Sequence, residues 1–398
     1  MEHDTTVNSD QIPPENSYRS NTAMVLPGGG ARAAYQVGVL KALAEIHGSR
    51  PGNPFPILAG TSAGGINAVS MAAGAHHFTG TVEKLEMLWR NLTTDKIYRA
   101  DFFGVMRNAL RLAVSLFSSG SSDGKPVALL DNSPLRALLN EHVKFENIGR
   151  NILNGDLDAL CLTAMNYTQG VSETFFQGGP QYAGWQRWRR QGLATPIQLQ
   201  HLMASSAIPT IFPPTKLGRD YYGDGALRQL TPISPVIHLG ANRVLVIPAN
   251  GHKRQYPKLP QEIKSPGFGQ IIGHLLNSAF IDSIETDIER LERINELVRL
   301  IPEEDQSMMG KELLPIDCLV ISPSEDIDRI ADEHVNELPR SLRIFLRRTG
   351  STGNSGGGVS IASYLLFTPE YCGKLIDLGY RDGMKQQEQL EAFLYRDK

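Results

Sequence analysis

The chain has 398 residues, of which 41% are hydrophobic and 20% are charged. This length and composition are typical of a globular protein with one large domain or two. Because 39 basic residues stand against 42 acidic ones and no Lys/Arg-rich block occurs, the formal net charge of -3 argues against a nucleic-acid-binding protein.

The cysteines and the apolar runs exclude further classes. Cys161, Cys318 and Cys372 lie far apart without a C-x-x-C pair, so the sequence predicts no disulfide framework, no metal site and no cofactor. No apolar run reaches the 18 residues that a membrane-spanning helix needs. Residues 1–21 are polar and acidic, unlike a signal peptide. We therefore expect a flexible N-terminal tail and a cytoplasmic protein that is peripheral to a membrane at most.

The chain after this tail reads as a strand, a glycine loop and a helix. Residues 23–26 are apolar, residues 28–30 are all glycine, and apolar residues recur at helical spacing over 31–46. The same order returns with a strand over 55–59, a turn over 60–65 and a second helix. Two such units in succession predict an α/β fold with a central, mostly parallel sheet flanked by helices.

Further elements follow along the chain. A proline-containing connection over 251–267 separates a core, residues 22–250, from a mainly helical C-terminal region, residues 251–398, which we expect to pack on the same core. Segments 118–125 and 351–358 are rich in Gly and Ser and are predicted to be loops. The predicted strands are Ala159–Tyr167, Glu173–Phe176, Arg243–Ile247 and Cys318–Ser322, and the predicted helices are Glu83–Leu92, Pro134–Glu141, Ile197–Ser205 and about 268–300.

The second turn contains a candidate nucleophile. Ser62 lies between Gly60 and Gly64 in the pattern G-x-S-x-G, after an apolar strand and before a helix of small residues. A nucleophilic serine needs such a sharp strand-to-helix turn, with neighbours too small to clash, to expose its Oγ near the positive end of a helix dipole. The alternative is an ordinary tight turn with an incidental serine.

The first glycine loop can supply backbone donors. Gly28, Gly29 and Gly30 can turn several N–H groups toward one point, as an oxyanion hole requires, and Arg32 can add positive charge or fix the loop. No Lys-Ser/Thr pair follows, so a P-loop is excluded. Gly28, Gly30 and Ala33 nearly match a dinucleotide fingerprint, but the next strand ends in the serine turn rather than in an acidic residue. Nucleotide binding remains the alternative function of this loop.

A candidate general base stands between two glycines. Asp224 follows the aromatic pair Tyr221 and Tyr222, which would keep the carboxylate dry and raise its proton affinity. Taken alone, however, the local sequence favours an Asp-Gly turn.

Four blocks taken together carry a resemblance. GGGAR at 28–32, GTSAGG at 60–65, ASSAIPTIFPP at 204–214 and DGA at 224–226 follow one another in this order. In these blocks the chain resembles the patatin-like phospholipase family, from Thr22 to Ile247.

The resemblance implies a patatin-like fold related to cytosolic phospholipase A2 catalytic domains. It implies a catalytic dyad in which Ser62 is the nucleophile and Asp224 the base, with Gly28–Gly30 and Arg32 as the oxyanion hole. The expected reaction is hydrolysis of fatty-acyl esters of phospholipids, lysophospholipids or neutral lipids, without a metal. Two departures from the family pattern, Ala33 and Ala226 in place of glycine, remove none of these groups.

Other mechanisms remain open. A Ser-His-Asp triad would need a histidine late in the chain, and a catalytically inactive lipid-binding protein would keep the fold without the reaction. The histidines that qualify, by their order in the chain alone, are His238, His252, His274 and His334.

Two segments are candidates for contact with lipid. Residues Phe102–Phe117 and Leu338–Arg348 both combine an apolar helical stripe with arginines, which suits either a membrane surface or an ordinary half-buried helix. Residues 282–299 have heptad-like spacing, which favours packing on the core over a coiled-coil dimer. Nothing in the sequence indicates a homo-oligomer, so the expected partners are a fatty-acyl lipid and, peripherally, a membrane.

Overall fold

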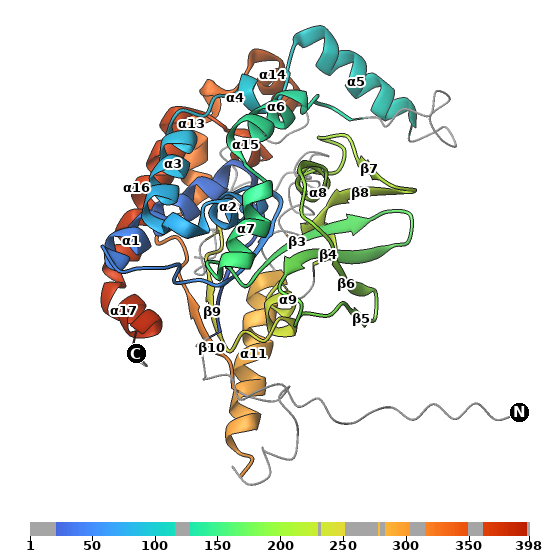
Figure 1. Ribbon diagram of the computed structural model, residues 1–398. Helices are drawn as coiled ribbons and strands as arrows, with labels where there is room; N and C mark the ends of the chain where they lie inside the picture. The colour runs from blue at the N-terminus through green and yellow to red at the C-terminus, as the bar shows by residue number, and fades with distance from the viewer. Residues whose placement is uncertain are drawn as a thin grey trace, which may run out of the picture.

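One mixed sheet of ten strands forms the centre of the computed structural model, which describes residues 21–115, 128–229, 232–250, 278, 283–302, 315–348 and 361–395 (Figure 1). The strand order is β10-β9-β1-β2-β3-β4-β6-β5, and β8 pairs with both β3 and β7. The strands are β1 (Thr22–Leu26), β2 (Ile57–Thr61), β3 (Ala159–Asn166), β4 (Val171–Gly178), β5 (Trp185–Arg187), β6 (Arg190–Ala194), β7 (Thr215–Leu217), β8 (Asp220–Asp224), β9 (Arg243–Val246) and β10 (Asp317–Val320).

The five strands from β10 to β3 are parallel, and their side chains alternate between two apolar layers. Met24 and Leu26 face one layer, whereas Ala23 and Val25 face the other, as the two-residue period of a strand requires. Because both faces are covered, β1 and β2 are buried along their whole length. This double covering explains why both strands read as continuous apolar runs rather than as alternating ones.

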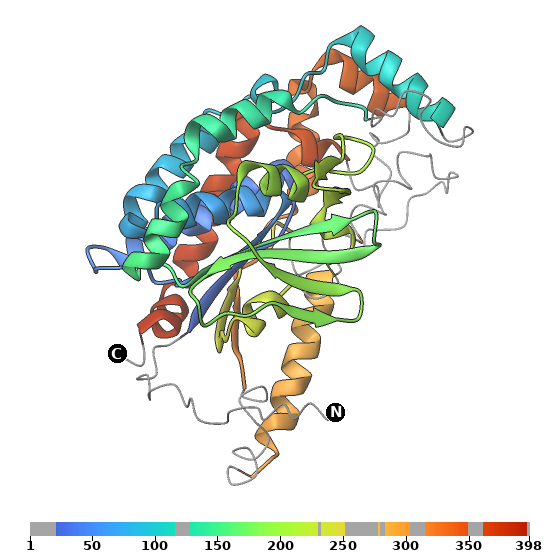
Figure 2. The same ribbon diagram turned by 45° about the vertical axis from the view of Figure 1, so that its right-hand side comes forward.

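Helices lie on both faces of the sheet (Figure 2). Helices α1, α2, α3 and α16 belong to the layer that contains Met24 and Leu26, and α9 and α11 belong to the opposite layer. The helices of four or more residues are α1 (Ala34–His47), α2 (Ser62–Ala73), α3 (Phe78–Arg90), α4 (Thr94–Ile97), α5 (Phe102–Ser115), α6 (Ser133–His142), α7 (Glu146–Asn154), α8 (Leu199–Ser205), α9 (Ser234–His238), α11 (Ser283–Arg299), α13 (Ile327–His334), α14 (Arg340–Arg348), α15 (Ile361–Leu365), α16 (Pro369–Lys385) and α17 (Gln387–Tyr395), and the 3-10 helix η1 spans Gly30–Ala33.

The C-terminal region is part of the same packed body. Strand β10 extends the sheet by pairing in parallel with β9. Helix α16 packs on α1, where the Tyr35 hydroxyl donates to the Asp382 carboxylate at 3.1 Å. The N-terminal half of the chain therefore shares its sheet and its core with residues that lie more than 250 positions later.

The predicted fold class is confirmed, while several boundaries differ. Strand β2 begins at Ile57 and includes Gly60 and Thr61, so the second turn starts later than predicted. The predicted connection over 251–267 lies outside the described residues. None of the strands β5 to β8 is among the predicted strands, because these segments are short and contain no apolar run. Among the described helices, none combines the length and the apolar composition needed to cross a bilayer.

Candidate active site

The two glycine-containing turns meet at the carboxyl ends of neighbouring strands. Strand β1 lies between β2 and β9, and from β1 the chain continues to β2 and β3 on one side and later to β9 and β10 on the other. Ligands of open α/β sheets bind where the strand order reverses in this way. The loop over 28–30 follows β1 and Ser62 follows β2, so both turns lie at this position.

Ser62 has the backbone geometry of a nucleophile turn. Its φ angle is 55°, in the left-handed region that few side chains adopt, and it is the first residue of α2. Gly64 makes this turn possible, since a Cβ there would lie 2.1 Å from the Leu26 carbonyl oxygen. The turn is thus pressed against the end of β1, and Ser62 itself is buried at the positive end of a helix dipole.

Ser205, at the end of α8, holds this strained turn. The backbone N–H of Ser62 donates to the Ser205 Oγ at 2.9 Å, and the Ser205 hydroxyl donates to the Thr163 carbonyl at 2.6 Å. Both groups are buried, so the bonds fix Ser62 without competition from water. Ser205 is not predicted as a site residue from the sequence. It lies in the block 204–214, but a serine that acts through another residue's backbone carries no motif of its own.

Asp224 is brought beside Ser62 by the sheet. It is the last residue of β8, opposite Ala164 of β3, while Thr163 is the register partner of Thr61 in β2. The Asp224 Oδ1 accepts the backbone N–H of Ala226 at 3.0 Å, and its own backbone N–H donates to the Ala207 carbonyl at 2.9 Å. Hydrogen bonds therefore fix both the side chain and the backbone of Asp224.

Burial dominates the protonation of Asp224. The side chain is fully buried, and desolvation raises its pKa to about 7, although the Ser62 hydroxyl and the Ala226 N–H act to lower it. The Oδ2 atom forms no regular hydrogen bond within the described residues. The Ser62 hydroxyl thus lies close enough to lower the pKa of Asp224 without forming a regular hydrogen bond to Oδ2. Such a loose arrangement is common before substrate binds. The Oδ2 atom is therefore open to receive a proton.

The glycine loop is closed on one side by the C-terminal region. Gly30 has a φ of 56°, and a Cβ there would lie 2.3 Å from the Tyr364 carbonyl oxygen. At the base of the loop, the Gln36 amide donates to the Pro27 carbonyl at 2.8 Å. Gly28, Gly29 and Gly30 are all buried, so in this arrangement the loop packs against its neighbours and does not lie open on the surface.

Arg32 points its charge into the C-terminal region. Its guanidinium donates to the Ser363 Oγ at 2.8 Å from Nε, to the Asp328 carboxylate at 2.5 Å and to the Asn250 side chain. It also lies 4.3 Å from the centre of the Tyr364 ring. Of the two roles predicted for Arg32, this geometry fits fixing the loop, since every guanidinium nitrogen is already engaged.

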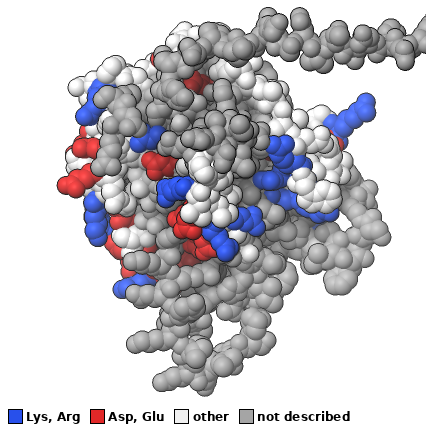
Figure 3. Space-filling model, turned by 90° about the horizontal axis from the view of Figure 1, so that it is seen from below, with Lys and Arg blue, Asp and Glu red and all other residues white. Residues whose placement is uncertain are grey.

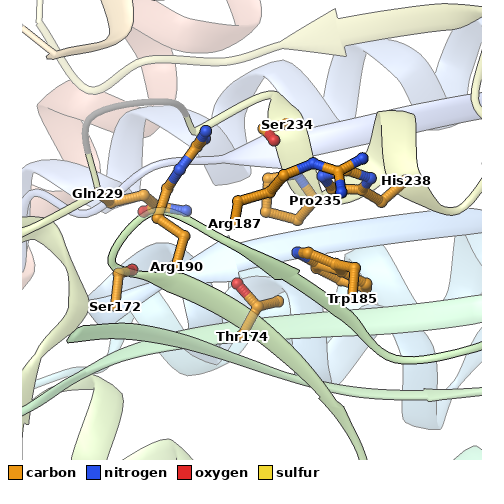
Figure 4. A pocket seen from close by; sticks show the side chains of 9 residues that line it. All are labelled: Ser172, Thr174, Trp185, Arg187, Arg190, Gln229, Ser234, Pro235 and His238. Atoms are coloured by element: carbon orange, nitrogen blue, oxygen red, sulfur yellow. The ribbon is translucent and has the colours of Figure 1, made fainter. Parts of the chain in front are cut away.

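A small hollow lies behind the serine turn, on the α9 face of the sheet (Figure 4). Arg187, Arg190 and His238 line it together with hydroxyl and amide groups, and its volume of about 20 Å³ suits a single water molecule. Gln229 connects it to the turn by accepting from the Thr61 hydroxyl at 2.5 Å. A hollow of this size and polarity is not an acyl-chain pocket.

Metal and histidine chemistry find little support in the described residues. No group of three or more His, Cys, Asp or Glu side chains there could hold a metal ion. His238 stacks on Trp185, and His334 bonds to Glu337 at 2.5 Å. His252 and His274 lie outside the described residues.

Comparisons with known proteins identify a family and include a distant solved structure. A family model described as patatin-like phospholipase matches residues 24–237, more than half of the chain. Among solved structures, the crystal structure of VipD from Legionella pneumophila is similar at 13% sequence identity and a TM-score of 0.35, covering 93% of this chain and 67% of that one. No curated protein matches the chain.

Proposed function

Because the chain belongs to the patatin-like phospholipase family, we propose that it is a lipid acyl hydrolase that works through a dyad of Ser62 and Asp224. The observation that carries this proposal is the placement of a strained, buried serine beside a buried carboxyl whose pKa burial raises to about 7. A base needs a proton affinity of this order to assist a serine near neutral pH.

In the proposed first step, the Ser62 Oγ attacks the acyl carbonyl carbon while Asp224 takes the hydroxyl proton. The negative charge that forms on the carbonyl oxygen is stabilised by backbone N–H groups of the loop over 28–30. This loop directly follows Leu26 and Pro27, whose carbonyls face Gly64 of the serine turn. The intermediate then expels the alcohol, which receives the proton from Asp224, and leaves an acyl-serine ester.

The second step releases the acid. Water attacks the acyl-serine carbonyl, and Asp224 accepts one of its protons and returns it to the Ser62 oxygen as the ester bond breaks. The products are a fatty acid and the free enzyme. The fully buried position of Asp224 keeps bulk water from competing for the proton.

Labelling with a fluorophosphonate probe tests the nucleophile. We expect wild-type protein to take up one probe per chain, at Ser62, because the turn lowers the barrier to attack by that hydroxyl alone. The Ser62→Ala variant should take up none, whereas Ser206→Ala, which changes a neighbouring buried serine, should label as wild type does. Labelling that persists in Ser62→Ala, or its absence from folded wild-type protein, would reject the proposal.

The pH dependence tests the base. Asp224 acts only when ionised, and its raised pKa lies near 7. For a soluble ester, kcat/KM should therefore fall about tenfold per pH unit below about pH 7.

The stability of the fold should change with pH in the opposite sense to the activity. The folded state holds a proton that the unfolded state loses near pH 4, so the free energy of unfolding should decrease as pH rises from about 4 through about 7. A decrease in kcat/KM that begins only near pH 4 would contradict a buried base.

A further inference from the structure

Helix α5 presents an unusual face to solvent. Its outward side carries Phe103, Met106 and Leu110, which are 84%, 44% and 67% exposed and follow one another at helical spacing. Arg107 and Arg111 are exposed on the same side. A helix of a globular protein normally turns its large apolar residues toward the core, so an exposed aromatic and aliphatic stripe of this kind marks an interaction surface.

The inward side of α5 is already fixed to the molecule. Val105 is buried, and the Asn108 amide donates to the Leu129 carbonyl at 3.3 Å. Next to α5 lies α14, whose Ser341 hydroxyl donates to the Ala100 carbonyl at 2.5 Å (Figure 2). The helix already contacts the rest of the molecule through its inward side, so the outward stripe is a second, separate apolar face.

Helix α14 shows the contrast. In the segment Leu338–Arg348, which the sequence predicts as a second candidate for contact with lipid, Leu338, Leu342 and Leu346 lie in the core. Only Arg340 and Ile344 face outward among the side chains described there. Of the two segments, α5 alone has a large apolar face available for a partner.

The α5 surface is connected to the candidate active site. Leu129, whose carbonyl accepts the Asn108 amide of α5, donates its own backbone N–H to the Thr210 carbonyl at 2.8 Å. Thr210 belongs to the block 204–214, in which the Ala207 carbonyl accepts the backbone N–H of Asp224. Three hydrogen bonds, from Asn108 to Leu129, from Leu129 to Thr210 and from Asp224 to Ala207, thus lie along the path from the helix to Asp224. Figure 1 shows α5 at the same end of the molecule as α8 and β8.

We infer that α5 docks on an anionic lipid bilayer, with Phe103, Met106 and Leu110 entering the boundary between headgroups and acyl chains. Arg107 and Arg111 flank this stripe and complement anionic headgroups. The attraction has to be local, since the chain carries a net charge of -3 and charges of both signs appear on the underside (Figure 3). This inference rests on the proposed function, because a bilayer would supply the acyl lipid.

Vesicle sedimentation with the full-length Ser62→Ala protein tests docking without turnover. We expect it to bind vesicles of phosphatidylcholine with 30% phosphatidylglycerol, and the additional pair Phe103→Ser and Leu110→Ser to weaken this binding at least tenfold. Replacing Arg107 and Arg111 by glutamine should weaken it about tenfold, and should leave the weaker binding to pure phosphatidylcholine unchanged. The matched control is Leu153→Ser on α7, which is 88% exposed and should bind as the parent does.

Three outcomes would overturn the inference. The first is no binding of the parent protein to anionic vesicles, and the second is equal binding by the stripe variant, which carries Phe103→Ser and Leu110→Ser. The third is a dimer in solution that the stripe variant dissociates, which would assign the face to a second copy of the chain.

An activity measurement separates the docking proposal from the proposed function. In the Ser62-containing protein, the stripe variant should hydrolyse a soluble ester at the wild-type rate, so loss of vesicle binding with retained turnover concerns docking alone.

Discussion

Replacing Asp224 by asparagine is expected to lower kcat/KM for a soluble ester by about 10³–10⁴-fold. Asparagine keeps the size of the side chain and can still accept the Ala226 N–H through its carbonyl oxygen, but it cannot take the proton of the Ser62 hydroxyl. Steady-state kinetics above pH 8, where the wild-type carboxyl is ionised, give the full difference.

The same substitution should not destabilise the protein. Since desolvation raises the pKa of Asp224, the buried charge is unfavourable above pH 7, and neutral asparagine should raise the free energy of unfolding at pH 8. Asp287→Asn is the matched control. Asp287 is also buried with its pKa raised to about 6, and it accepts the Ile233 N–H on the opposite face of the sheet. Its substitution should change kcat/KM by less than threefold, and equal losses in both variants would remove Asp224 from the role of base.

Replacing Asp328 by alanine is expected to lower the free energy of unfolding by about 3 kcal/mol. Asp328 is 28% exposed, but its partner Arg32 is fully buried, and removing the carboxylate leaves that guanidinium without its counter-ion. The glycine loop should loosen with it, so kcat should also decrease. Urea denaturation followed by intrinsic fluorescence measures the first effect, and the soluble-ester assay measures the second.

An exposed ion pair provides the control for Asp328. Glu325 bonds to Arg381 at 2.8 Å, but both side chains are more than half exposed, so Glu325→Ala should change stability by less than about 0.5 kcal/mol. If both variants cost the same small amount, Arg32 is held by its remaining partners. If Asp328→Ala is unstable but fully active, the loop does not depend on this contact.

The sequence predicted those parts of the molecule that local patterns encode. The apolar runs before Gly28 and Gly60 predicted two buried strands, because a strand covered on both faces must be continuously apolar. G-x-S-x-G located Ser62, since the turn needs small neighbours. Asp224 was a different case: an Asp-Gly pair is common in turns, and only the order of four blocks drew attention to it.

Other features could not be predicted, because they depend on contacts between distant segments. Ser205 binds the Ser62 backbone across 143 positions, and nothing in its neighbours indicates this. The same holds for Arg32, whose partners Asp328 and Ser363 lie 296 and 331 positions away. An apolar helical stripe in segment 102–117 was visible as a pattern. Which residues of the segment face the core and which face the surface depended on the side that Val105 and Asn108 would occupy.

The reach of Arg32 has a consequence for how the chain acquires its structure. The glycine loop after β1 is held through Arg32 by Asp328 and Ser363, which a ribosome adds 296 and 331 residues after Arg32. Contacts this far apart form late in folding, because the intervening chain must first be ordered. A nascent chain that already contains Ser62 and Asp224 would still lack the partners of Arg32. Under the proposed function, synthesis itself would thus delay lipid hydrolysis until Asp328 and Ser363 have been added.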